Sequence, residues 1–223
     1  ALPISGSSSD TSDGGMVEVI SGAGAQTGGS VSISAGQGVQ TGGSLILGDG
    51  GSAEGFGGGI SISSQHGDRS GDLELSTGTS TDSSGRMVLM TGDSSGQAGS
   101  VLLKTGSSGI GDGASVRLAA GDTDTSTLSG GQVEVFAGTG PVGGGVDIGG
   151  GLGTSDTGGH VRLTGGAGSS SARGGHVMVT GGTRAGEVVL AGGFSDDETS
   201  SGGAVRVIGG DAIHNGGDVS LIS

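Results

Sequence analysis

The chain has 223 residues, of which 59 are glycine and only 1% are aromatic, and its formal net charge is −14. Such a composition excludes a conventional core built on large side chains and would by itself indicate disorder. The acidic balance also excludes nucleic acid as a partner, because phosphates need a basic surface. No apolar run is long enough for a membrane-spanning helix, so membrane insertion is not expected.

The chain begins with a Ser- and Asp-rich segment, residues 1–13, which is predicted to be a tail, a cap or a connector. From residue 14 to 223 a short Gly-bounded repeat recurs, which predicts a tandem array. A glycine precedes the first apolar residue of each repeat by two positions, except at Ala114. Another follows it by five, except at Gln65 and in the last repeat, where that position lies beyond Ser223. The first apolar residues are at 17, 31, 45, 60, 73, 87, 101, 116, 133, 146, 161, 177, 188, 205 and 219.

Within each repeat, apolar and variable residues alternate, as in Val161-Arg162-Leu163, which is typical of a strand with one buried face. A small residue closes that face, for example Ser21, Ala35, Thr77, Thr91 or Ala120. The pattern predicts an all-β fold: a tandem-repeat parallel β-solenoid or β-roll of about 15 short strands. The flanking glycines mark bends that need positive φ or close backbone approach.

The shortest spacing, from Val177 to Val188, leaves no room for a separate return strand and favours two strands per coil. Facing sheets would then bury Val161 and Val177 in a thin core, where a charged substitution would be costly. One repeat per coil is the second interpretation. An antiparallel meander is the third, because it would leave one apolar face uncovered.

Outward positions carry charges and apolar side chains. Arg117, Glu134, Asp147 and Arg162 follow one another at the central outward site, so opposite charges are expected to pair between neighbouring repeats. Apolar residues at outward sites predict a contact face for a partner chain, against the alternative of scattered single exposure. This predicted assembly face consists of Ile46, Val88, Leu102, Phe136, Met178, Val189 and Ile208.

No catalytic constellation is present, and the chain is predicted not to be an enzyme and to need no cofactor or metal. The glycines punctuate repeats and do not lead into a helix, as a phosphate-binding loop requires. His160 and His176 occupy equivalent outward positions and are interpreted as surface residues. The acidic bend at residues 196–198 is interpreted as solvated charge.

The Gly-x-Val-x-Ile/Val/Leu repeats from Gly15 to Ser223 resemble the Gly/Ser-rich tandem-repeat β-solenoids of microbial and algal surface fibres and adhesins. The resemblance implies an extracellular or cell-surface location. We therefore expect a structural subunit or segment of a filament or surface appendage, assembled by end stacking and lateral packing. Its partners would be copies of itself or related repeat modules, with glycans as a further partner class.

Two alternatives stay open. One is an ice-binding β-solenoid, for which Thr164 and Thr180 are the clearest pair of consecutive outward threonines. The other is a carbohydrate-binding adhesin repeat, although the aromatic platforms that such sites often use are missing.

Overall fold

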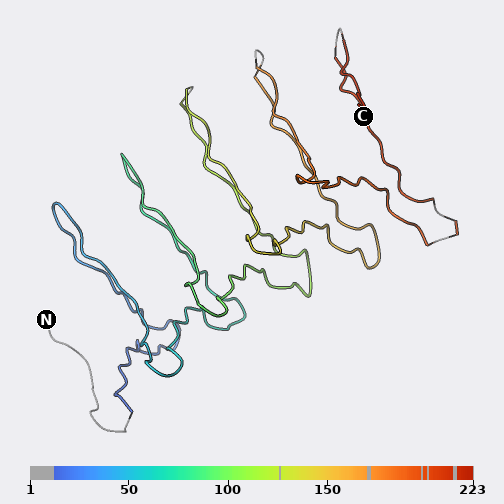
Figure 1. Cartoon of the computed structure of the whole chain (residues 1–223). Helices are drawn as coiled ribbons and strands as arrows, with labels where there is room; N and C mark the ends of the chain where they lie inside the picture. Colours follow the sequence, from blue (N-terminus) through green and yellow to red (C-terminus); the bar gives the residue numbers. More distant parts are fainter. Residues whose placement is uncertain are drawn as a thin grey trace. The chain divides into compact units, whose positions relative to one another are not determined.

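The structure is a computed structural model that describes residues 13–125, 127–169, 172–196, 198–199, 201–212 and 215–222. Throughout these ranges it contains no helix and no strand, and Figure 1 accordingly draws an unadorned trace. The predicted all-β parallel β-solenoid of about 15 strands, two per coil, is therefore wrong. Of the predicted N-terminal segment 1–13, all but Asp13 lies outside the described residues.

The backbone hydrogen bonds explain why extended segments do not become strands. A solenoid needs bonds that join one coil to the next, many residues further along the chain. The backbone bonds given for the described residues instead join positions only 3 to 10 apart, so they close local loops. Alternating side chains therefore give an extended backbone here without a ladder between segments.

The described residues form no core. No side chain among them is buried, and the chain exposes 22,430 Å² to solvent. A compact folded protein of 20.6 kDa would expose about 8,900 Å² and the fully extended chain about 30,000 Å². Most of the surface that folding normally removes from water thus stays exposed, and the expected thin core at Val161 and Val177 is absent, with these side chains 49% and 51% exposed.

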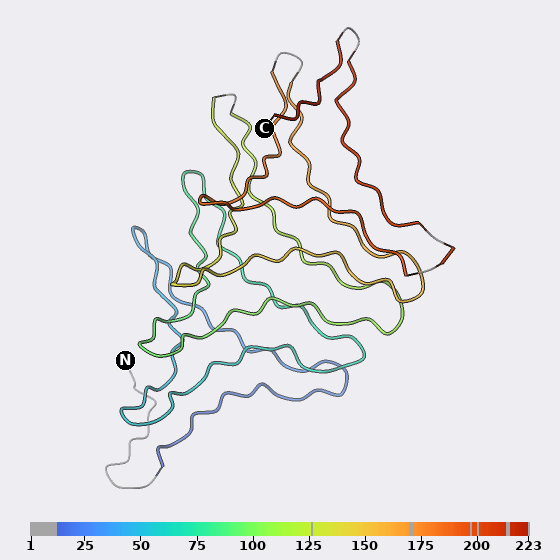
Figure 2. The same cartoon turned by 45° about the vertical axis from the view of Figure 1, so that its right-hand side comes forward.

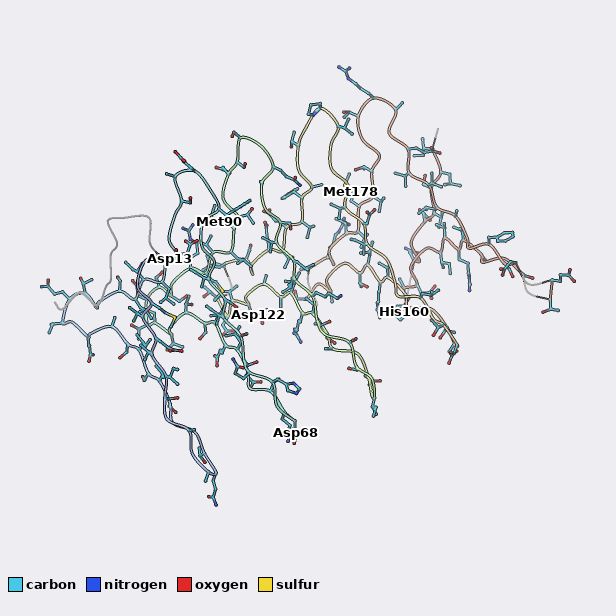
Figure 3. All side chains as sticks on the ribbon, turned by 90° about the horizontal axis from the view of Figure 1, so that it is seen from below. Asp13, Asp68, Met90, Asp122, His160 and Met178 are labelled. Carbon is cyan, nitrogen blue, oxygen red and sulfur yellow. The ribbon has the colours of Figure 1, made fainter. Side chains whose placement is uncertain are left out.

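The chain divides into two compact units, Ala1–Leu103 and Lys104–Ser223. In each unit taken by itself, extended stretches alternate with loops, and the alternation continues through the whole colour range in Figure 2. Side chains project away from the trace in Figure 3 and do not gather around a shared interior. The regularly repeated backbone hydrogen bonds of the described residues consequently lie at the loops.

Candidate assembly surface

Each loop joins two successive repeats and is bounded by the glycine position that ends one repeat and the glycine position that begins the next. We call the glycine two residues before the first apolar residue the entry glycine, and the one five residues after it the exit glycine. In ten of the fourteen loops, the entry N–H donates to the C=O of the preceding exit glycine, over 2.7–3.0 Å. These bonds run from Gly29 to Gly22, Gly43 to Gly36, Gly58 to Gly50, Gly131 to Gly121, Gly144 to Gly138, Gly159 to Gly151, Gly175 to Gly166, Gly186 to Gly182, Gly203 to Gly193 and Gly217 to Gly210.

The bonded loops differ in length, but the distance across their closing hydrogen bond stays nearly the same. Three residues lie between Gly182 and Gly186, whereas nine lie between Gly121 and Gly131, yet the closing distances are 3.0 and 2.9 Å. The ends of the loop are thus held at one separation whatever the loop contains. Each extended segment that lies between two bonded loops consequently leaves and re-enters them in the same way.

The four loops without this bond are consecutive and lie between Gln65 and Ala114. The first lacks an exit glycine because Gln65 stands there. In the other three, a threonine precedes the exit glycine, where bonded loops have serine, alanine, aspartate or glycine. A Cβ placed on the entry glycine Gly85 would lie 3.5 Å from the Thr77 methyl. In the next loop, a Cβ placed on Gly99 would lie 3.5 Å from the Thr91 methyl.

We infer that the extra methyl group occupies the space into which the entry glycine closes. The third threonine makes a different contact, since the Thr105 hydroxyl donates to the carbonyl of Ala114 over 3.3 Å. The residue before the entry glycine also differs between bonded and unbonded loops. It is glycine in every bonded loop except at Ala185, and in three of the unbonded loops it is Ser70, Ser84 or Ala98.

Close approach, more than positive φ, explains the glycines. Among the described glycines only Gly111 has a positive φ, of 97°. In the last five bonded loops, the residue before the exit glycine is itself glycine, and a Cβ there would overlap the entry carbonyl oxygen, as at Gly150 against Gly159. In the earlier five it is a small side chain; the Ala35 Cβ would lie 3.3 Å from a Cβ on Gly43.

The shortest loop turns with left-handed backbone at two residues that are not glycine. Arg184 and Ala185 have φ of 67° and 66°. Two consecutive positive φ values are typical of the tightest reversals, where Asn-Gly is the favoured pair. Each such residue with a Cβ costs about 1 kcal/mol or more, so this loop is strained.

Serine hydroxyls shape several loop tips. Each of these serines follows an exit glycine by two residues and accepts a backbone N–H nearby: Ser52 from Gly55, Ser80 from Asp82 and Ser94 from Gly96. Such turns compete with other backbone pairing and suit exposed connections. Two of the three lie in unbonded loops, so the tip keeps a turn where the loop base has lost its bond.

The apolar side chains keep the phase that the sequence predicts but stay exposed. The first apolar residue of each repeat is 44–58% exposed, and the one two residues later is 59–94% exposed. The predicted assembly face is exposed at every member: Ile46, Val88, Leu102, Phe136, Met178, Val189 and Ile208, from 55% to 86%. Exposure therefore does not separate this set from the row predicted to face inward.

The largest exposures belong to residues outside both rows. Val39, Phe56 and Ile110 lie in loops and are fully exposed. The repeat pattern gave no reason to single them out, because loop residues follow no fixed phase. Their only signal in the sequence is a large apolar residue among glycine and serine.

Charged residues make no ion pair that the structure gives for the described residues. The expected pairing among Arg117, Glu134, Asp147 and Arg162 within the chain is not seen; Arg162 Nε donates to Thr164 Oγ1 over 3.1 Å instead. Asp68 lies at the tip of a loop in Figure 3, with no chain segment beyond it. These charges therefore face solvent in the single chain.

The part of the chain that is described contains no pocket and no group of three or more residues able to hold a metal ion. His66, His160 and His176 are all exposed, whereas His214 lies outside the described residues, as does Asp197 of the acidic bend. Nor does any described helix offer the length and apolarity needed to cross a bilayer. No family model, no curated protein and no solved structure matches this chain.

Proposed function

We propose that this chain is a structural subunit, or a segment of one, in an extracellular filament or surface appendage that is built from copies of the chain. The observation that carries the proposal is the exposed area. About 2.5 times the surface of a compact protein of this mass stays in contact with solvent, and the apolar rows are part of it. Folded soluble monomers rarely leave so much apolar surface uncovered.

The loop geometry supports the same conclusion through its energetics. Closing a loop of eight residues costs about 2 kcal/mol in chain entropy, before any constant term. The single exposed hydrogen bond at its base contributes only about 0.5–1.5 kcal/mol. One bond therefore contributes less than loop closure costs, and contacts with other copies of the chain would offset the difference at the ten bonded loops.

Copies of the same chain are the partner that fits the repeated surface. Every repeat presents an extended segment whose backbone N–H and C=O groups are unpaired within the described chain. Unpaired extended backbone is a template for further chains of similar period. Stacking of exposed solenoid ends has no support now that the described residues form no solenoid, so lateral contact between extended segments is the proposed mode of assembly.

An extracellular location rests on sequence. The Gly- and Ser-rich repeats resemble those of surface-fibre proteins, and this resemblance is what implies the location. Repetitive backbone pairing does not depend on the redox state of the compartment, in contrast to a disulfide framework.

The test is sedimentation over a range of protein concentrations, with electron microscopy of the pelleted material. We expect filaments above a critical concentration and monomers below it. Thermal hysteresis is measured on the same samples. A chain that stays monomeric at all concentrations and inhibits ice growth would overturn the filament proposal in favour of ice binding.

A further inference from the structure

Bonded loops make the repeats interchangeable as docking units. The entry and exit glycines are held 2.7–3.0 Å apart, donor to acceptor, whether three or nine residues lie between them. Extended segments that flank bonded loops therefore present equivalent backbones to a neighbour. Two copies that run in the same direction can align with no offset, or shifted by any whole number of repeats.

Charge disfavours the alignment without an offset. An alignment without an offset would place every charged outward residue beside the same residue of the neighbouring chain, and each chain already carries a net charge of −14. Like charges directly opposite each other on neighbouring segments are destabilising. Alignment in register is therefore the arrangement that the outward charges oppose most.

A shift of one repeat removes most of these repulsions and creates three attractions, while the remaining charged outward residues come to lie beside uncharged ones. In the outward position before the first apolar residue, Asp72 then lies beside Arg86 of the neighbour. In the central outward position, Arg117 lies beside Glu134 and Asp147 beside Arg162, while Glu134 beside Asp147 is the one like-charged pair. Fourteen of the fifteen repeats still overlap, so almost all of the apolar row can be covered.

We propose that the partner of this surface is a second copy of the chain, running in the same direction and shifted by one repeat, so that the bonded loops set the step and the outward charges set the offset. The inference rests on the proposed filament. It adds a reason for open growth, because a shifted arrangement is heterologous: each added copy leaves the same surface exposed at the end. A two-fold pairing would instead close as a dimer.

Disulfide cross-linking tests the offset, since the chain contains no native cysteine. Ser30 and Ser44 are exposed, occupy the same position in successive repeats and tolerate a Ser→Cys change. Chains carrying Ser30→Cys and chains carrying Ser44→Cys are mixed, assembled under reducing conditions and only then oxidised. Neighbouring backbones about 5 Å apart satisfy the Cα separation of a disulfide.

We expect cross-linked dimers from the mixture and at least about tenfold fewer from either variant alone, because a position two segments away is out of reach of a disulfide. Equal cross-linking of either variant alone would show an in-register filament and overturn the offset while leaving the filament proposal intact. Filaments with no cross-links in either format would also overturn the offset, whereas absence of assembly would overturn the filament itself.

Charge exchange provides an independent measurement. Arg117→Glu replaces an attraction to Glu134 of the neighbour by a repulsion, and the critical concentration should rise about three- to tenfold. Arg69→Glu changes the net charge equally but lies in a loop, so it controls for overall charge. Adding Glu134→Arg to Arg117→Glu should restore assembly. A rise that matches the Arg69→Glu control, or no rescue by the second change, would overturn the one-repeat shift.

Discussion

A matched pair of substitutions in one loop tests whether close backbone approach requires glycine at the base of that loop. A Cβ on Gly159 would lie 2.9 Å from the backbone nitrogen of Gly151, closer than side chains tolerate against backbone, whereas a Cβ on Gly151 would meet nothing within 4 Å. Gly159→Ala should therefore force the two backbones apart and remove the 2.8 Å hydrogen bond between them. The expected loss is about 0.5–1.5 kcal/mol for that loop, or roughly a fivefold fall in its closed population.

Gly151→Ala is the control, because both changes remove the same backbone freedom from the open chain. At a position with space and ordinary φ this effect stabilises by about 0.4–1 kcal/mol. The assay is quenched hydrogen–deuterium exchange at the amide of residue 159, read by NMR. Faster exchange is expected in Gly159→Ala, and unchanged or slower exchange in Gly151→Ala. Equal acceleration in both variants would refute the argument from close approach.

Four further outcomes are expected. Ala35→Thr should speed amide exchange at the base of its bonded loop, and Thr91→Ala should slow amide exchange at the base of its unbonded loop, because the threonine methyl fills the space between the entry and exit glycines. Exchange rates that do not respond to these two substitutions would contradict this. Replacing Arg184-Ala185 by Asn-Gly should stabilise the shortest loop by about 1 kcal/mol or more, seen as slower exchange at its closing amide. Val177→Asp should leave the dissociated chain unchanged by circular dichroism, since that side chain is 51% exposed, but raise the critical concentration for assembly. Added salt, or pH lowered towards the isoelectric point near 4.2, should promote assembly of a chain with net charge −14. Assembly that weakens with salt would contradict this expectation and show that attraction between the outward charges outweighs the repulsion between acidic chains.

The sequence allowed the loop bases to be located but not the pairing of the segments between them. The two conserved offsets within the repeat, two residues before and five after the first apolar residue, are the donor and acceptor positions of all ten closing bonds. That success has a physical basis, because close approach of two backbones is a local requirement that only small residues meet. The sequence pattern treats threonine before the exit glycine as a small residue like serine and alanine, yet the loops that follow Thr77 and Thr91 lack the bond.

The error about the fold has an equally definite cause. Alternation such as Val161-Arg162-Leu163 sets which side chains share a face of an extended segment, and that requirement is met with or without a neighbouring strand. Whether segments then pair as strands depends on contacts between residues far apart in sequence. Such contacts stabilise the pairing more when large side chains cover each other. With three phenylalanines and no tryptophan or tyrosine, the apolar rows offer little area per repeat to offset the ordering of the chain.

The same shortage of area argues for many copies rather than for one strong interface. Each repeat contributes two apolar side chains and one short extended backbone, so a single pair of repeats gains little on contact. The gains add along the array because ten of the fourteen loops are bonded and keep the segments on either side of them equivalent. Across such a loop, a neighbour that matches one segment matches the next at no further cost in loop rearrangement. Shortening the array should then weaken assembly steeply: removing five repeats takes away a third of these contacts, and because contacts act on the logarithm of the affinity, the critical concentration should rise by far more than threefold. A proportional change of only about one third would show that assembly depends on one local site and would contradict the distributed surface.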